Sequence, residues 1–263
     1  MLQTQAPRES GLLAVAEVSV RFGGIVALDG ISFEIAAGQV AGLIGPNGAG
    51  KTTLFNCLSR LYRWNQGAIV FDGRPLLSIP RHGIAAAGIG RTFQNLALFR
   101  TMTVQDNVML GRHCRTASGF FSNALRLPRV AREERASAEK ARELIAFLDL
   151  SPVAEKRVAD LPFGTQKRVE LARALASEPK LLLLDEPASG LNHEEVEALG
   201  KLIRDIRDRL GVTVLLVEHH MGLVMSVSDK VVALNFGRKI AEGTPNEVRE
   251  QPEVIRAYLG TAH

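Results

Sequence analysis

The chain has few cysteines, few aromatic residues and no long apolar run, and each shortage excludes a class of protein. Its 263 residues include only Cys57 and Cys114, which lie far apart and outside any CxxC motif. We therefore expect two reduced thiols, and neither a disulfide framework nor a zinc site. No stretch approaches the roughly 20 apolar residues that a membrane-spanning helix needs. Arg8 and Glu9 stand where a secretory signal requires apolar residues, which predicts a cytoplasmic protein.

Excess charge of either sign is also small. The 32 Lys and Arg residues against 28 Asp and Glu residues give a net charge of +4. No basic stripe with interleaved aromatic residues is present, so we expect no nucleic-acid partner. What the chain does have is 46% hydrophobic residues and 24 glycines. With aromatic residues at only 5%, this composition favours an α/β protein with one large core.

The order of the apolar runs predicts an antiparallel β-subdomain followed by a parallel core sheet. Short β-branched runs at 15–20 and 31–35 are separated by glycine-containing turns, as in antiparallel strands. Later runs are apolar on both faces and most alternate with helical patterns, which is typical of buried parallel strands. We expect these core strands at 40–44, 68–71, 181–184, 212–217 and 231–234.

Helical patterns interrupt and follow the core strands. The segment from Thr101 to about Asp160 has no strand pattern and is rich in Ala, Arg, Glu and Leu, which predicts an inserted helical subdomain. A packing helix is predicted after Asn192, a good N-cap residue, and it should end at Gly211.

Residues 45–52 match the pattern GxxxxGK[ST] between a predicted strand and a predicted helix. The glycines allow backbone N–H groups to turn toward a phosphate, and the helix N-terminus adds its positive dipole end. Lys51 can reach the β- and γ-phosphates, and the Thr52 hydroxyl can ligate Mg²⁺. The predicted nucleotide-binding residues are Gly45, Pro46, Asn47, Gly48, Ala49, Gly50, Lys51, Thr52 and Thr53.

Two carboxylates follow the apolar run at 181–184, at the strand end where open parallel sheets bind ligands. Asp185 is placed to hold Mg²⁺, and Glu186 can orient and deprotonate an attacking water. Alone, this acidic pair is as often the start of a loop as a site. Together with the loop at 45–52, it predicts nucleotide hydrolysis.

Three further features narrow the class of nucleotide-binding protein. Gln94 precedes the helical insertion, His219 follows the predicted strand at 212–217, and residues 161–166 open a helix. In this order the motifs resemble the ATP-binding subunit of ATP-binding cassette (ABC) transporters, and the resemblance covers nearly the whole chain. It implies a P-loop NTPase fold of the ABC ATPase type with a parallel core sheet, an N-terminal antiparallel β-subdomain and an inserted α-helical subdomain.

The resemblance also implies roles and boundaries. Two subunits would enclose two ATP molecules, each completed by the partner's signature residues, here Gly164, Thr165 and Gln166. Phe22 would stack on adenine, although a strand-end core aromatic is the alternative. Gln94 would bind Mg²⁺ and link the catalytic water to the membrane subunit, and His219 would contact the γ-phosphate. The single ATP-binding domain would span 11–263: core and β-subdomain at 11–95 and 161–235, helical subdomain at 96–160, C-terminal extension at 236–263.

Within this family the sequence most resembles the longer ATPase subunit of branched-chain amino acid importers, notably at residues 91–95, 187–192, 217–221 and 252–260. This resemblance implies a second ATPase subunit, equal or different, two membrane permease subunits and a periplasmic solute-binding protein. It places the chain peripherally on the cytoplasmic face of the inner membrane. Import of urea or small organic acids, and lipopolysaccharide export, are the alternatives within transport.

Two other classes fit less well. A cassette ATPase acting on DNA or ribosomes would carry a long coiled-coil insertion or two cassettes. A P-loop kinase or GTPase has no use for Gln94, His219 and the segment at 161–166, and the chain lacks the NKxD guanine-reading motif.

The signature departs from the family's usual Leu-Ser-Gly-Gly-Gln. Pro162, Phe163 and Thr165 replace the serine, the first glycine and the glutamine. Because proline has no N–H and the serine hydroxyl is absent, phosphate donation falls to Gly164 and Thr165. Our hypothesis is that the ATP site completed by this signature is weaker or depends on the partner subunit.

Overall fold

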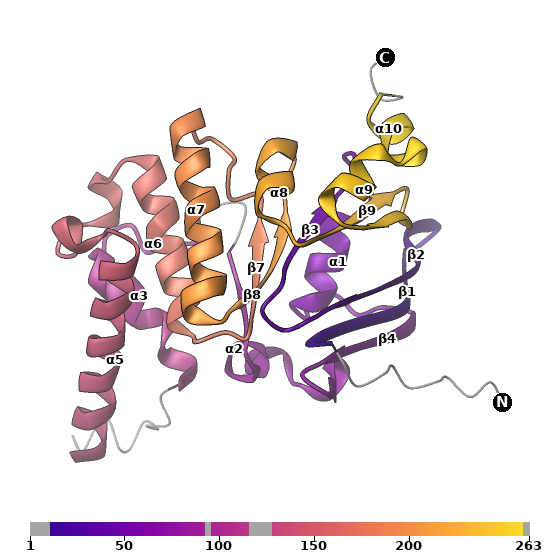
Figure 1. Ribbon diagram of the computed structural model, residues 1–263. Coiled ribbons are helices and arrows are strands. Elements are labelled where there is room, and N and C mark those ends of the chain that lie inside the picture. The colour runs from indigo at the N-terminus through magenta and orange to yellow at the C-terminus, as the bar shows by residue number, and fades with distance from the viewer. Residues whose placement is uncertain (1–10, 93–95, 116–127, 260–263) are drawn as a thin grey trace.

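The structure is a computed structural model that describes residues 11–92, 96–115 and 128–259, with the side chains of 128–132 and 259 not described. Two sheets and several helices make up this part of the chain (Figure 1). A four-stranded antiparallel sheet has the order β2-β1-β4-β5. Its strands are β1 (Leu13–Phe22), β2 (Ile25–Ile35), β4 (Gln66–Phe71) and β5 (Arg74–Pro75).

The second sheet has six strands in the order β10-β9-β3-β8-β7-β6. Its five strands from β9 to β6 pair in parallel and β10 pairs antiparallel with β9, so the expected parallel core is confirmed. The strands are β3 (Val40–Ile44), β6 (Ile89–Arg91), β7 (Leu181–Asp185), β8 (Thr213–Val217), β9 (Lys230–Asn235) and β10 (Arg238–Gly243).

One strand prediction is wrong in its placement. The run at 68–71 was expected in the parallel core, but it belongs to β4 and pairs antiparallel with β1. Within this run only Ile69 and Phe71 are buried, which is the alternation of a strand with one face on the core. The core strands β3, β7 and β8 are buried at every position.

The helices are α1 (Lys51–Leu58), α2 (Ile84–Ala87), α3 (Val104–Gly111), α5 (Pro128–Phe147), α6 (Phe163–Ala176), α7 (His193–Leu210), α8 (Met221–Val227), α9 (Pro245–Glu250) and α10 (Pro252–Leu259). Short 3₁₀ turns lie at Leu76–Ser78, Arg81–Gly83, His113–Arg115, Ser151–Val153 and Val158–Asp160. No helix in the described ranges is long and apolar enough to cross a membrane.

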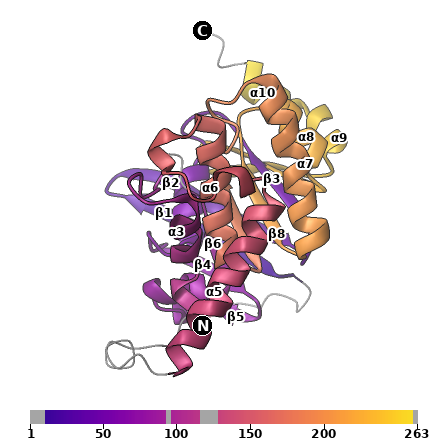
Figure 2. The same cartoon turned by 90° about the vertical axis from the view of Figure 1, so that its left-hand side faces the viewer.

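The six-stranded sheet has a separate apolar core on each face. Leu181 and Leu183 pack with β1, β2 and α1 on one face, whereas Leu182 and Leu184 pack with α6, α7 and α8 on the other. The alternation of side chains along a strand explains why each strand must be apolar throughout. Helices α3, α5 and α6 pack against one another, on the face of the sheet that α7 and α8 also cover (Figure 2).

The predicted helix after Asn192 is confirmed as α7. The Asn192 side chain accepts the Glu195 N–H, and the Glu195 carboxylate accepts the Asn192 N–H, so both form a capping box. Gly211 ends the helix in the left-handed conformation, with φ of +67°. Residues next to the helix in the sequence therefore fix both ends of α7.

Candidate functional site

The loop at residues 45–52, here called the phosphate loop, joins the central strand β3 to α1. Gly45 has φ of +151°, and a Cβ there would lie 2.3 Å from the Leu234 carbonyl oxygen. Gly50, at φ of +101°, precedes the first helical residue, and a Cβ there would lie 2.7 Å from the Ala27 carbonyl oxygen. Both positions therefore require glycine. The helix begins at Lys51 with no acidic residue in its first turn, so its positive end remains available to an anion.

Lys51 is only 5% exposed, and its ammonium group is held by the loop itself. Its Nζ donates to the carbonyl oxygens of Gly45 at 2.7 Å and Pro46 at 2.9 Å. Burial lowers the pKa of Lys51, while the nearby carboxylates of Glu186 and Asp185 raise it. The predicted phosphate-binding lysine and the predicted acidic pair therefore share one electrostatic environment.

Asp185, at the end of β7, is buried and paired with Arg91 of β6. Arg91 Nη2 lies 2.9 Å from Asp185 Oδ2, and Nη1 donates to Asn56 of α1 at 2.8 Å and to Ser59 at 2.9 Å. The guanidinium group thus ties the carboxylate to the C-terminal part of the helix that follows the phosphate loop. Sequence reasoning had used Arg91 only as part of a motif, and 94 residues separate it from Asp185.

Glu186 and His219 meet at the ends of β7 and β8. Glu186 Oε1 lies 2.6 Å from His219 Nε2, and the Glu186 N–H donates to the Val217 carbonyl oxygen at 2.9 Å. Glu186 adopts φ of +49°, an uncommon conformation for a residue other than glycine. The strand pairing of β7 with β8 brings together two residues that the sequence had selected separately.

Sequence reasoning missed Glu218, which precedes His219 and is 3% exposed. Its carboxylate accepts three backbone N–H groups, from Ala188 at 2.6 Å, His219 at 3.0 Å and His220 at 3.3 Å. It thereby joins the loop after Glu186 to the loop that carries His219. The available signal was an acidic residue at the end of an apolar strand, the same signal that selected Asp185.

The predicted signature residues lie at the start of α6. Gly164 abuts α7, since a Cβ there would lie 2.4 Å from Glu195 Oε1. Phe163 is 47% exposed, and the Lys167 ammonium lies 5.4 Å from its ring centroid. Lys167 Nζ also donates to the Glu186 carbonyl oxygen at 3.4 Å. Thr165 and Gln166 are partly buried, and the Gln166 amide donates to the Leu161 carbonyl oxygen.

The remaining predicted site residues are Phe22, Thr52, Thr53 and Gln94. Phe22 is 47% exposed at the end of β1, so it is no core residue, and its ring meets Tyr62 edge to face at 5.3 Å. Thr52 is exposed and Thr53 is partly buried in the first turn of α1. Gln94 lies outside the described residues. Among the residues that the structure does describe, no group of three or more His, Cys, Asp or Glu side chains forms a metal cage.

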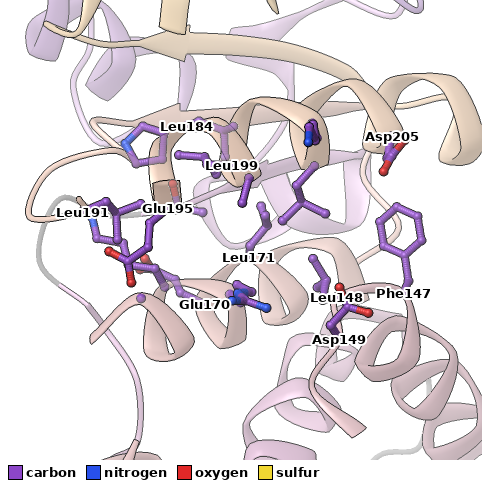
Figure 3. A pocket seen from close by; sticks show the side chains of 18 of the residues that line it. Phe147, Leu148, Asp149, Glu170, Leu171, Leu184, Leu191, Glu195, Leu199 and Asp205 are labelled. Atoms are coloured by element: carbon purple, nitrogen blue, oxygen red, sulfur yellow. The ribbon is translucent and has the colours of Figure 1, made fainter. Parts of the chain in front are cut away.

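A cavity of about 470 Å³ lies between α6 and α7. Leu171 of α6 and Leu199 of α7 line it, with Phe147 and Asp149 at one end and Glu195 at the other (Figure 3). It also reaches the predicted magnesium ligand at the end of β7, but none of residues 45–52 lines it. The cavity therefore lies between the signature helix and α7 and is distinct from the phosphate loop.

Sequence comparisons agree with the motifs. The ABC transporter family profile matches residues 28–189, and that of the branched-chain amino acid ATP-binding cassette transporters matches residues 238–263. The high-affinity branched-chain amino acid transport ATP-binding protein BraF of Pseudomonas aeruginosa is 42% identical over 95% of this chain and 98% of its own length. LivG of Escherichia coli, described in the same words, is 41% identical over the same shares.

Solved structures match over the same extent. The ADP conformation of MJ1267, an ATP-binding cassette of an ABC transporter, has a TM-score of 0.80 and 29% identity, covering 95% of this chain and 98% of that one. The cbiO1 protein of Clostridium perfringens, part of the ABC transporter complex cbiONQ, has a TM-score of 0.79 and 31% identity, covering 97% and 96%.

Proposed function

Because the chain belongs to the ABC transporter family of ATP-binding proteins, we propose that it is the ATPase subunit that energises an importer of branched-chain amino acids. The observation that carries the catalytic part is the convergence of Lys51, Asp185 and Glu186 at the C-terminal ends of β3 and β7, two parallel strands that flank β8. The solute is supported by the profile match at 238–263 and by BraF and LivG, which align over nearly their whole length.

In this proposal the phosphate loop binds the β- and γ-phosphates through its N–H groups and Lys51. The nine residues 45–53 form this part of the site, and Phe22 contributes a face for adenine. Gly164, Thr165 and Gln166 of a second subunit complete the site from across the dimer. The exposed position of Phe22 supports its role, because a ring packed in the core cannot stack on a base.

Magnesium fits the donors that the chain offers. The Thr52 hydroxyl and the Asp185 carboxylate are hard oxygen donors, and Mg²⁺ usually takes only one or two protein ligands beside phosphates and water. We assign Thr52, Asp185 and Gln94 as the residues that would hold it. When bound, the ion would offset charge on the transferring phosphate. Arg91 holds the Asp185 carboxylate in place for this role, with Nη2 2.9 Å from Oδ2.

Hydrolysis requires a base beside the γ-phosphate. Glu186 accepts a proton from water as the water oxygen bonds to the γ-phosphorus, and the bond to the ADP oxygen breaks, giving ADP and phosphate. His219 holds the Glu186 carboxylate in place and contacts the γ-phosphate, while Gln94 positions the water. Glu218 holds the loop after Glu186 and the loop that carries His219 together, because its carboxylate accepts three backbone N–H groups from them.

The partners follow from the same proposal. A second ATPase subunit, two permease subunits and, through them, a periplasmic binding protein would form the importer, with this chain peripheral on the cytoplasmic face of the membrane. ATP would close the ATPase dimer and hydrolysis would open it. We assign 11–95 and 161–235 to the catalytic core and β-subdomain, 96–160 to a helical subdomain and 236–263 to a C-terminal extension. The cavity beside α6 leaves room for that helix to shift against α7.

The test of the function is ATP-driven uptake by the reconstituted importer. Leucine uptake should require ATP and stop with Lys51→Ala, because the variant loses the cation that binds the phosphates. Lys180→Ala is the matched control, since its ammonium forms an exposed pair with Asp72. Uptake of urea or a small organic acid in place of leucine would overturn the solute assignment, and undiminished nucleotide binding by Lys51→Ala would overturn the site.

The altered signature has its own test. We propose that the ATP site completed by Pro162, Phe163 and Thr165 is weak or depends on the partner subunit. ATPase turnover should be low for this chain alone and rise when the partner is added. Full turnover by the isolated chain would remove the partner requirement.

A further inference from the structure

The first turn of α6 contacts the loop that carries the proposed base. This loop, residues 186–192, joins β7 to α7 and is here called the base loop. Lys167 Nζ donates to the Glu186 carbonyl oxygen at 3.4 Å, and the Ser189 N–H donates to the same oxygen at 3.1 Å. Lys167 therefore joins the signature helix to the residue whose carboxylate is proposed to accept the proton.

The Phe163 ring makes a second contact between α6 and the base loop. A Cβ added at Gly190, which has φ of +80°, would lie 2.9 Å from Phe163 Cε1, so the ring lies directly on the Gly190 backbone. The Lys167 ammonium lies 5.4 Å from the centroid of this ring, within the range of a cation–π interaction. Lys167, Phe163 and Gly190 thus form one cluster, here called the ring cluster.

The surroundings of Lys167 are partly buried and acidic. Burial lowers the pKa of Lys167, whereas nearby carboxylates, foremost that of Glu170, raise it. Glu218 holds the base loop as well, since its carboxylate accepts the Ala188 N–H at 2.6 Å. The base loop is therefore fixed both by the first turn of α6 and by the residue that follows β8.

Glu186 needs such contacts because its backbone conformation is unfavourable. Its φ of +49° is uncommon for a residue other than glycine, and a residue stays in this region only when its neighbours hold it there. Without the Lys167 ammonium, the Glu186 carbonyl oxygen would keep the Ser189 N–H but lose its contact with α6. The peptide could then turn, and the carboxylate would move with it.

We propose that Lys167 is a positioning residue for hydrolysis, which holds Glu186 through its carbonyl oxygen in the conformation that a base requires. The Phe163 ring over Gly190 supports the ammonium in this position. The inference rests on the proposed function. Because Phe163 belongs to the signature, the ring cluster also ties the proposed base to the segment proposed to complete the ATP site of the partner subunit.

The test compares Lys167→Met with the wild-type chain in the assembled ATPase. Methionine is unbranched and apolar like the lysine stem but has no ammonium, so kcat should fall about ten-fold. The Kd for MgATP should change by less than about two-fold, because a positioning role acts on the reaction and not on nucleotide binding. Steady-state phosphate release gives kcat, and calorimetric titration gives Kd.

Two further variants serve as controls for the loss of the ammonium. Lys167→Arg keeps a cation that can donate to a carbonyl oxygen and stack on the ring, so it should keep at least about half of the wild-type kcat. Lys201→Met removes an exposed ammonium from α7, on the opposite wall of the cavity, and should resemble the wild type. A loss of turnover in Lys167→Arg equal to that in Lys167→Met would overturn the role of the cation.

A double-mutant cycle shows whether Lys167 acts through Glu186. Glu186→Gln has already lost the proposed base, so adding Lys167→Met should lower its residual turnover by less than about two-fold. A further ten-fold loss in the double variant would mean that Lys167 acts independently of Glu186, which would overturn the proposal.

Gly190→Ala tests the ring contact without changing a charged group. Its Cβ would displace the Phe163 ring, so kcat should fall while the Kd for MgATP stays close to that of the wild type. Gly211→Ala is the matched control, since Gly211 also has a positive φ, of +67°, but an added Cβ there meets nothing within 4 Å. Equal kcat values for the two variants would refute the role of the ring.

The outcomes distinguish this inference from the proposed function. If the wild-type ATPase neither binds nor hydrolyses ATP, the proposed function fails. If it hydrolyses ATP and Lys167→Met has the wild-type kcat, only the role of Lys167 fails. A Lys167→Met protein with wild-type kcat at saturating ATP and a raised Kd would place Lys167 in nucleotide binding, and would equally overturn the proposal.

Discussion

Glu186 Oε1 lies 2.6 Å from His219 Nε2, which joins the carboxylate after β7 to the imidazole after β8. The Glu186 side chain is 19% exposed and that of His219 is 43% exposed, so the pair opens toward solvent. Lys51 is near enough for the Glu186 charge to affect its pKa. The arrangement places the proposed base and the proposed orienting histidine close to Lys51 of the phosphate loop.

Glu186→Gln should abolish turnover while preserving ATP binding. The amide keeps the size of the side chain but cannot accept a proton, so kcat should fall by about 10² to 10⁴. ATP should then hold the subunits in a closed dimer, which size-exclusion chromatography detects. Glu250→Gln, at an exposed position on α9, is the control. Hydrolysis by Glu186→Gln at the original rate would show that Glu186 is not the base.

Glu218→Gln should destabilise the protein and slow hydrolysis together. The buried carboxylate accepts three N–H groups, and an amide has only one acceptor oxygen and would turn its NH₂ group toward a donor. We expect a loss of about 1–3 kcal/mol in the free energy of unfolding, measured with urea. Glu197→Gln, whose side chain is 68% exposed, should be neutral. Equal unfolding midpoints for the two variants would contradict this reading.

Gly45→Ala should be far more damaging than Gly38→Ala. Both glycines have positive φ, but a Cβ at Gly38 meets nothing within 4 Å, whereas one at Gly45 would lie 2.3 Å from the Leu234 carbonyl oxygen. Gly38→Ala should cost about 1–2 kcal/mol for conformation alone. Gly45→Ala adds a backbone clash and should shift the phosphate loop. Urea unfolding and MgATP titration measure the two effects, and similar values for both variants would rule out the clash.

Cys57 should make the stability fall at high pH. Burial raises the pKa of its thiol from 9.0 to about 12. Between these values the unfolded chain loses the proton and the folded chain keeps it, so the free energy of unfolding falls by about 1.4 kcal/mol per pH unit. Below pH 9 the thiol keeps its proton in both states, so it adds nothing to the pH dependence of the free energy of unfolding. Urea unfolding between pH 8 and 10.5 measures this dependence.

Cys57→Ala should remove the contribution of this thiol to the fall in the free energy of unfolding between pH 9 and 10.5. Cys114→Ala is the matched control, because Cys114 is only partly buried and the charges of Arg115 and Arg112 oppose the rise in its pKa. An unchanged slope in Cys57→Ala would mean that the thiol ionises alike in both states.

The sequence by itself determined the features that depend on neighbours along the chain. The glycine pattern at 45–50 and the helix beginning at Lys51 follow from local backbone requirements. The ends of α7 at Asn192 and Gly211 are set by hydrogen bonds within a few residues. Apolar runs identified the buried strands, because a strand covered on both faces has to be apolar at every position.

Only the tertiary structure decided which distant groups meet. An apolar run states how deeply a strand is buried but not which strand lies beside it, so residues 68–71 were expected in the wrong sheet. The sequence likewise does not show which partner a charged residue contacts. The contacts of Arg91 with Asp185 and of Glu218 with Ala188 arise from the order of the strands in the sheet.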